Sequence, residues 1–365
     1  MKIYCNRNEL NKALINVSHS VPARTTSPIL EGILVEVSDN QLKLTATDTI
    51  ITIETIISAE CNEKGSFVVP AKLFSSIVAK LPEEDIMLDA GENKIAIKCG
   101  GSNTSLLCMS ADEFPKIRID EGNNEIMLSK ESVKKLIKKT AFSASTDDFN
   151  GILTGVLLEI KDGNMKMVAA DPFRIASYNV EVANDEDVSV IIPAKLASDV
   201  AKIISDEGED NISLEVVDKK VVFKFDNNKV IINTFSGKYI GYERVLNMEG
   251  AINVRVQRTE LLKSIDRASL LTSIQNNNLI KFNVENEYMI IKSLSEEGNI
   301  EEKVEIIKDG DDILIGLNSK YVKDVLSVIE DEEIFINFKD STSPCIIKPL
   351  KGNKYKYVVL PIRIN

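Results

Sequence analysis

Apolar residues recur four positions apart in three polar stretches of the chain, a spacing that places them on one face of a helix. The three apolar pairs are Leu10 with Leu14, Val133 with Ile137, and Leu261 with Ile265. The second pair begins 123 residues after the first, and the third begins 128 residues after the second. This regular separation indicates an internal repeat.

A second pattern recurs in register with the first: a short apolar strand, a break at proline or glycine, and a further helix. Residues 67–73 read FVVPAKL, and residues 190–196, again 123 positions later, read VIIPAKL. The third copy is looser and reads ILIGLN at 313–318. Together the two patterns predict six helices, at about 6–18, 71–81, 129–142, 194–204, 257–271 and 318–329.

Alternating apolar and polar residues between these helices predict paired strands, joined by turns of aspartate, asparagine and glycine. The pairs lie at 32–37 with 41–46, at 155–160 with 165–170, and at 280–284 with 288–292, and the copies end in strands near 105–109, 230–235 and 357–361. We therefore expect an α+β protein of three tandem modules. Their predicted bounds are 1–122, 127–248 and 251–365, with polar linkers near 121–124 and 247–250.

The composition is ordinary for a globular protein, with 44% hydrophobic and 27% charged residues among 365. No apolar run approaches the roughly twenty residues of a membrane span, and the chain turns polar after Ile3, unlike a signal peptide. The five cysteines are scattered and never form a Cys-x-x-Cys pair. We therefore expect reduced thiols, no membrane contact and a cytoplasmic location.

The net charge of −12 argues at first against nucleic acid as a partner. The predicted helices, however, carry a net charge of +10, and the rest of the chain carries −22. Exposed lysines that only solvate a helix explain any single one of these helices better, but six basic helices on one surface would bind phosphates. The basic residues of the helices are Arg7, Lys12, Lys72, Lys80, Lys130, Lys134, Lys135, Lys138, Lys139, Lys195, Lys202, Arg258, Lys263, Arg267, Lys320 and Lys323.

The sequence shows no pattern of a catalytic or metal site. The single histidine, His19, lies between serines at a predicted helix end, which suits a surface or capping residue better than a general base. The segment 100–102 reads GGS and lacks the lysine of a phosphate-binding loop. Carboxylate pairs at 83–84, 147–148 and 311–312 could hold Mg²⁺, but they have no counterparts in the other copies. We expect no catalysis, no cofactor and no metal.

Several short motifs follow one another along the whole chain. They are MKI at 1–3, PARTTSPIL at 22–30, VPAK at 69–72, DEFP at 112–115, DPFRIA at 171–176, YERVL at 242–246 and YVVLPIR at 357–363. In this order, within a triplicated chain of this length, they resemble the bacterial sliding clamps, the β subunits of DNA polymerase III. The resemblance implies a non-catalytic processivity factor that encircles duplex DNA and tethers the replicative polymerase.

The resemblance also implies a ring of two chains joined head to tail, with helices lining the inner face and antiparallel sheets outside. Twelve helices about 9 Å apart form a circle roughly 34 Å across between helix axes. Subtracting about 5 Å of helix radius on each side leaves roughly 24 Å, enough for duplex DNA. The implied partners are duplex DNA, a second copy of the chain, the α subunit of DNA polymerase III, the clamp loader, and other DNA polymerases and repair proteins that insert short peptides.

Three sets of site residues follow from the resemblance. The DNA-contact positions are Arg24, Lys72, Lys195, Asp147, Gly151 and Ile152, of which the last three depart from the family's residue types. The peptide-groove positions, between the second and third modules, are Leu153, Ala170, Phe173, Arg174, Ile175, Ile240, Arg244, Val245, Thr342, Pro344, Val358, Val359, Leu360, Pro361, Ile362 and Arg363. The dimer-interface positions are Leu107 in the first module and Leu270 and Leu271 in the third.

In the groove, apolar side chains would anchor the peptide, while Arg174 and Arg244 would donate to its carbonyls. The segment 170–172 reads ADP where the family has Thr-Asp-Gly, and 239–240 reads YI where it has Phe-Pro. Two other classes of protein stay open. One is a carboxylate-metal enzyme of nucleic-acid metabolism, and the other is a repeat scaffold that binds only proteins.

Overall fold

The computed structural model describes residues 1–116, 125–184, 187–273 and 276–364, and the chain divides into two compact units. Unit 1 comprises Met1–Glu131 and Lys202–Thr234, and unit 2 comprises Ser132–Ala201 and Phe235–Asn365. The division falls within the helices α3 (Lys130–Thr140) and α4 (Ala194–Ile203), inside the predicted second module. The predicted linker at 121–124 lies outside the described residues.

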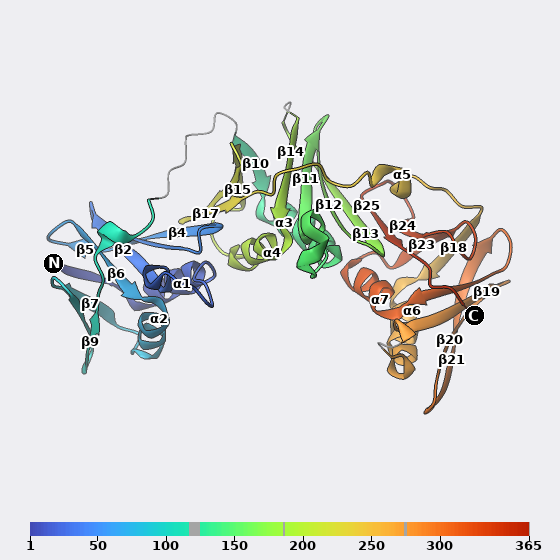
Figure 1. Cartoon of the computed structure of the whole chain (residues 1–365), viewed down its shortest axis with the longest axis horizontal. Coiled ribbons are helices and arrows are strands. Elements are labelled where there is room, and N and C mark those ends of the chain that lie inside the picture. Colours follow the sequence, from blue (N-terminus) through green and yellow to red (C-terminus); the bar gives the residue numbers. More distant parts are fainter. Residues whose placement is uncertain (117–124, 185–186, 274–275, 365) are drawn as a thin grey trace. The chain divides into compact units, whose positions relative to one another are not determined.

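Unit 1 contains two antiparallel sheets, with strand orders β5-β1-β7-β8-β9 and β10-β15-β16-β17-β4-β3-β2-β6. The elements are β1 (Lys2–Asn6), α1 (Arg7–Ser18), η1 (Pro28–Glu31), β2 (Gly32–Ser38), β3 (Gln41–Thr47), β4 (Ile51–Ser58), β5 (Glu60–Cys61), β6 (Gly65–Pro70), α2 (Ala71–Lys80), β7 (Asp85–Ala90), β8 (Lys94–Cys99), β9 (Ser102–Leu107), η2 (Ala111–Glu113), β10 (Glu125–Ser129), β15 (Asn211–Val217), β16 (Lys220–Phe225) and β17 (Asn228–Asn233). Because β17 pairs with β4, placing Val230 opposite Ile53, strands of the first and second modules form one sheet (Figure 1).

Unit 2 contains one antiparallel sheet, with the strand order β14-β11-β12-β13-β25-β24-β23-β18-β21-β20-β19-β22. The remaining elements are η3 (Ala141–Ser143), η4 (Asp148–Thr154), β11 (Gly155–Lys161), β12 (Asn164–Asp171), β13 (Arg174–Glu181), β14 (Val188–Pro193), α5 (Glu243–Leu246), β18 (Ile252–Gln257), α6 (Arg258–Ala268), η5 (Ser269–Leu271), β19 (Leu279–Glu285), β20 (Tyr288–Ser295), β21 (Gly298–Asp309), β22 (Ile313–Asn318), α7 (Ser319–Val328), β23 (Glu333–Phe338), β24 (Cys345–Pro349) and β25 (Tyr355–Val359). The pairing of β13 with β25, which places Ile175 opposite Val358, joins strands of the second and third modules (Figure 1).

The helices bury the apolar faces that their spacing predicts. In α1, Leu10 and Leu14 are fully buried, and in α6 the same is true of Leu261 and Ile265. The side chain of Asn6 caps α1 by accepting from two backbone N–H groups of its first turn. All six predicted helices are present close to their expected bounds, and the strands that end the copies begin about two residues earlier than expected. The short helix α5 and the 3-10 turns were not predicted.

Candidate functional site

A cation at the start of the first helix of each module reaches backbone carbonyls near the end of the second helix. Arg7 donates from Nε to the carbonyl oxygen of Val78 near the end of α2, at 3.1 Å. Arg258 reaches the carbonyl of Leu326 in α7 at 3.2 Å. Lys130 bonds a carbonyl four residues beyond α4, at 2.6 Å. Because helix C-termini carry partial negative charge, these cations stabilise the fold.

Two of the helix lysines are buried. Lys130, 5% exposed, pairs with Asp226 at 2.9 Å, and Lys139, 3% exposed, pairs with Glu330 at 2.9 Å. Lys139 also donates to a carbonyl at the end of α7 at 2.6 Å. Ammonium groups with these partners are not available to phosphates. The interpretation of all sixteen basic residues as one phosphate-binding face is therefore wrong for Lys130 and Lys139, and the helix-end cations described above also serve the fold.

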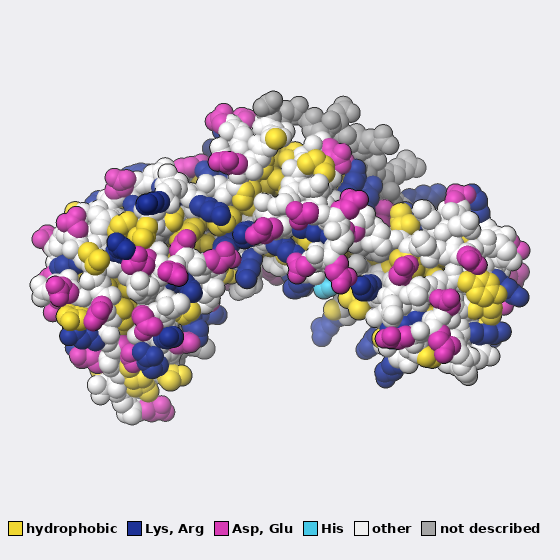
Figure 2. Space-filling model, turned by 180° about the vertical axis from the view of Figure 1, so that it is seen from behind, with side chains coloured by type: hydrophobic (Ala, Val, Ile, Leu, Met, Phe, Trp, Pro, Cys, Tyr) yellow, Lys and Arg dark blue, Asp and Glu magenta, His cyan; other side chains and the backbone are white. Residues whose placement is uncertain are grey.

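Three of the predicted DNA contacts are exposed cations. Arg24 and Lys72 in unit 1 and Lys195 in unit 2 form no hydrogen bond or ion pair with the residues that the structure describes. Figure 2 shows Lys and Arg side chains along the edge of unit 1 to which α1 and α2 belong. These side chains are therefore available to an anionic partner.

The other three predicted DNA contacts lie in the loop that begins at Asp147, and none of them is a cation. The carboxylate of Asp147 accepts a hydrogen bond from the backbone N–H of Phe149 at 3.0 Å, which caps η4. Gly151 has a φ of +52°, a left-handed conformation that favours glycine. Ile152 is half-buried against an apolar cluster, so its side chain is not directed into solvent. Of these three predicted DNA contacts, only Asp147 and Gly151 are exposed.

An apolar cluster in unit 2 brings β11, β12, β13, β24 and β25 together with α5, and we call it the groove cluster. Six predicted groove residues belong to it or pack against it: Leu153, Ala170, Ile175, Val245, Val358 and Leu360. The other members are Leu157, Val168, Ile191, Tyr239, Tyr242, Leu246, Met248, Ile346 and Ile152. Sequence reasoning did not assign these residues to the groove, and it placed Ile152 among the DNA contacts instead, although the four-residue spacing of Tyr242 and Leu246 was visible.

Tyr239 brings a polar atom into the groove cluster without leaving it unpaired. Its hydroxyl accepts from the backbone N–H of Ala170 at 3.1 Å and donates to the carbonyl of Gly155 at 3.2 Å. Burial raises the pKa of the Tyr239 hydroxyl to about 12, so it stays protonated. The hydroxyl therefore ties the segment before α5 to strands β11 and β12.

Arg174 is buried rather than free at the rim. Its Nε lies 2.9 Å from Asp171, its Nη1 lies 2.7 Å from Asp324 in α7, and its Nη2 donates to the carbonyl of Phe142 at 2.8 Å. The guanidinium also lies 4.5 Å from the ring centre of Tyr321. All three nitrogens already have partners within the chain. A peptide carbonyl could therefore accept only from the second N–H group of Nη1 or Nη2.

Arg244 is exposed and has no hydrogen-bond or ion-pair partner among the described residues. Ile240 and Phe173 are also exposed, at 38% and 54%, and Phe173 stacks on Tyr321 with the ring centres 6.4 Å apart. Thr342 is exposed in a turn in which its backbone N–H donates to Asp340 at 2.8 Å. These side chains are open to a partner, in contrast to Arg174.

Backbone hydrogen bonds to Phe173 and Gly316 hold the C-terminal segment. Val359 is buried, Pro344 and Pro361 are half-buried, and the backbone N–H of Leu360 donates to the carbonyl of Phe173 at 2.8 Å. The backbone N–H of Ile362 donates to Gly316 of β22, also at 2.8 Å. Arg363 is exposed and lines a separate cavity of about 520 Å³.

Comparison with known proteins shows which family has this arrangement of modules. Residues 1–118, 127–240 and 243–363 match the models of the N-terminal, central and C-terminal domains of the DNA polymerase III beta subunit. A beta sliding clamp of Staphylococcus epidermidis is 32% identical, covering 98% of this chain and 96% of the relative.

This chain belongs to the sliding-clamp family.

Two solved structures of the family have nearly the same fold. A putative DNA polymerase III beta subunit from Eubacterium rectale has a TM-score of 0.95 at 35% identity, with 99% of each chain covered. A beta sliding clamp from C. crescentus, with polyethylene glycol bound to a putative beta-motif tethering region, has a TM-score of 0.94 at 27% identity, with 100% of each chain covered. The α+β fold of three clamp modules is therefore confirmed.

Sliding clamps are non-catalytic processivity factors of DNA replication, and this chain is a member of that family. The described part of the chain contains no group of three or more side chains that could hold a metal ion. None of its helices is long and apolar enough to span a membrane. The function predicted from the sequence, conferring processivity on the replicative DNA polymerase, is confirmed by membership of the family.

Two of the strand edges that have no partner strand among the described residues lie beside exposed leucines. The strand β9 is the last of its sheet and ends at Leu107, which is 66% exposed. The first part of β21, at 298–305, pairs with β20 on one side and, among the described residues, with no strand on the other. Near it lie Leu270, 77% exposed, and Leu271, which is half-buried close to Gly298. Open edges of this kind recruit another strand unless they are protected.

Proposed function

We propose that two copies of this chain close head to tail into a ring in which β9 of one protomer meets the first part of β21 of the other. The single observation that supports this most is the pair of unpaired edges, each beside exposed leucines. Charges are also complementary, because Lys94 and Lys98 on β8 are exposed and the exposed Glu305 on β21 carries the opposite sign, while Glu301 already pairs with Lys292 at 2.8 Å. Leu107, Leu270 and Leu271 would form the apolar centre of this interface.

The ring would hold duplex DNA through diffuse contacts to phosphates. Arg24, Lys72 and Lys195 are the cations best placed for this, since each is exposed and unpaired among the described residues. Contacts to phosphates carry no sequence information, which a clamp that slides requires. Asp147 and Gly151 complete the proposed DNA-facing set, although the negative charge of Asp147 opposes phosphate contact.

Partner proteins would insert a short peptide over the groove cluster. The peptide would carry a glutamine and two or three large apolar side chains, whose burial contributes roughly 1.5–3 kcal/mol each. Phe173, Ile240 and Arg244 are exposed around the cluster and would complete the site. The partners of this proposal are the α subunit of DNA polymerase III, the clamp loader, and other DNA polymerases and repair proteins, acting in the cytoplasm.

The ring is tested by retention on DNA. The protein is loaded onto nicked circular DNA with a clamp loader, and the salt concentration is then raised. We expect it to stay bound to circles at about 1 M salt, where charge contacts are screened to roughly 3 Å, and to be released when the circle is cut. Equal loss from circular and linear DNA would contradict the ring and favour a scaffold that binds only proteins.

A further inference from the structure

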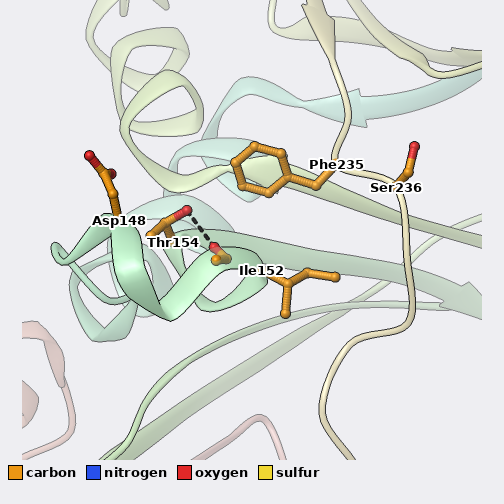
Figure 3. Close-up of a pocket in the computed structure, with 6 residues that line it drawn as sticks. Asp148, Ile152, Thr154, Phe235 and Ser236 are labelled. Atoms are coloured by element: carbon orange, nitrogen blue, oxygen red, sulfur yellow. Dashed lines mark hydrogen bonds between the residues drawn. The ribbon is translucent and has the colours of Figure 1, made fainter.

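A second cavity lies beside the groove cluster in unit 2. Its volume is about 400 Å³, within the range of roughly 300–1,000 Å³ of small-molecule pockets. It is lined by Asp148, Gly151, Ile152, Thr154, Phe235 and Ser236. Figure 3 shows Asp148, Ile152 and Thr154 along η4, and Phe235 and Ser236 on the segment that passes opposite it.

Two side chains of the lining, Phe235 and Ile152, are large and apolar, and hydrogen bonds to the backbone hold the segments around them in place. Phe235 is 37% exposed, and its N–H donates to the carbonyl of Ile191 at 2.8 Å, which fixes it beside β14. Opposite it, the Oγ1 of Thr154 donates to the carbonyl of Gly151 at 2.8 Å (Figure 3). The half-buried Ile152 forms the other apolar surface. A slot with these walls suits the methylene stem of a long side chain.

Asp148 is the only ionisable residue of the lining. It is exposed and forms no hydrogen bond or ion pair with the described residues. Its neighbour Asp147 differs, because that carboxylate caps the backbone of Phe149. The loop is further fixed by Asn150, whose side-chain amide donates to Ser145 at 2.8 Å. A free carboxylate on a stiff loop at an apolar slot favours a cation as its partner.

The cavity adjoins the groove cluster at one residue. The side chain of Ile152 packs against the groove cluster and also lines the cavity. A peptide held over the groove cluster therefore has this cavity next to it.

We propose that the cavity is an extension of the peptide groove and receives one lysine or arginine side chain of a partner peptide. The stem of this side chain lies between Ile152 and Phe235, and its charged head meets Asp148. The inference rests on the proposed peptide groove and adds a requirement for a basic residue beside the apolar anchors.

The test uses synthetic peptides and the full-length protein. A core peptide with glutamine and three large apolar residues is extended at either end by short linkers that carry lysine, methionine or glutamate. We expect the lysine peptide to bind about five-fold more tightly than the methionine peptide from one of the two ends, the gain of one ion pair at a partly exposed site. The glutamate peptide should bind more weakly than both.

Two variants separate a local contact from the general attraction of an acidic protein for cations. Asp148→Asn removes the carboxylate of the cavity and should abolish the preference for lysine while leaving the affinity for the core peptide unchanged. Asp147→Asn removes the same charge from the same loop, outside the lining, and should keep the preference.

The possible failures are distinguishable. If the core peptide does not bind, the proposed groove is wrong. If the core peptide binds but lysine and methionine extensions bind equally well, or if both variants lose the preference to the same degree, the inference about the cavity is overturned.

Discussion

At the scale of single residues, lysines of similar helices have unlike roles. Lys130 lies in a buried position with its ammonium group against Asp226 and a backbone carbonyl, whereas Lys138 on the same helix is exposed. The first side chain contributes to the stability of unit 1, and the second is solvated. Desolvation makes the difference large, because removing one partner of a buried pair leaves the other charge uncompensated.

We therefore expect Lys130→Met to lower the free energy of unfolding by about 3 kcal/mol. Lys138→Met, the matched control, should change it by no more than about 0.5 kcal/mol, as is usual for exposed positions. Urea denaturation followed by circular dichroism measures both. Equal effects of the two substitutions would mean that the buried pair does not contribute to stability.

The turn that presents Thr342 depends on the charge of Asp340. Hydrogen bonds from the side chains of Ser343 and Thr342 lower the pKa of the Asp340 carboxyl from 3.8 to about 2. A carboxyl whose pKa is lower in the folded state contributes stability above its unfolded pKa, and this contribution is lost as the pH falls through the folded value. The turn should thus be stable at neutral pH and weaken between about pH 4 and pH 2.

The expected result is that Asp340→Ala melts at a lower temperature than the unaltered protein at pH 6, and that the difference shrinks as the pH falls from 4 to 2. Differential scanning calorimetry across this range provides the measurement. A difference independent of pH would show that the hydrogen bonds of the charged carboxylate are not its cause.

Sequence reasoning at this scale could assign residue types to sites but not their burial. Arg174 was assigned to the rim of the groove on its family position, yet it is buried because Asp171 and Asp324 hold it. Asp324 lies 150 residues further along the chain, and no local pattern connects the two. Arg24 and Lys72 are exposed, and nothing in the described structure competes for their charges, while their role as DNA contacts stays a prediction.

At the scale of elements, the C-terminal segment depends on a glycine in β22. The added Cβ of an alanine at Gly316 would lie 2.8 Å from the carbonyl oxygen of Ile362 and 3.0 Å from a side-chain carbon of Ile364. Both contacts are too close, so the segment would have to move. The absence of a side chain at Gly316 therefore lets the end of the chain lie against the strand.

Gly316→Ala should accordingly destabilise unit 2 by about 1–3 kcal/mol, as overpacking does, and should speed hydrogen exchange at the backbone N–H of Ile362. Gly241→Ala is the matched control, since nothing lies within 4 Å of the added atom there. Hydrogen exchange read by mass spectrometry distinguishes the two. Unchanged exchange near Ile362 would indicate that the hydrogen bond to Gly316 does not hold the segment.

The helices were predictable because apolar residues recur in them at a spacing of about four. This pattern is local and does not depend on how the helices pack against the rest of the chain. The path of the C-terminal segment was not predictable, because the hydrogen bond between Ile362 and Gly316 of β22 joins residues that no sequence pattern connects. The short helix α5 escaped detection for a similar reason: four residues are too few to show a period.

At the scale of the whole molecule, the proposed ring depends on the exposed leucines beside the unpaired edges. We expect Leu270→Lys combined with Leu271→Lys to yield monomers of 40.5 kDa, because paired lysines would face an apolar surface of the partner. Leu314→Lys, a substitution at a 49% exposed leucine on β22, should leave the dimer intact. Sedimentation velocity reports the outcome, and dimers that persist in the double variant would place the interface elsewhere.

The sequence predicted three modules because the motifs repeat in one order. Which strands pair had to come from the structure, since β17 meets β4 and β13 meets β25 across gaps of more than 170 residues. Apolar alternation identifies a strand but not its neighbour.

The pairing of β17 with β4, and of β13 with β25, has a consequence for work on fragments of the gene. A truncated product that stops at the first border between repeats would lack β17 and leave the edge of β4 bare, and one that stops at the second border would lack β25 and leave the edge of β13 bare. Such an edge invites aggregation during expression. Complementary fragments that are produced together should instead associate through these edges. A reporter inserted into the surface turn between β11 and β12 interrupts neither pairing, and we expect the protein to tolerate it better than any cut at a repeat border.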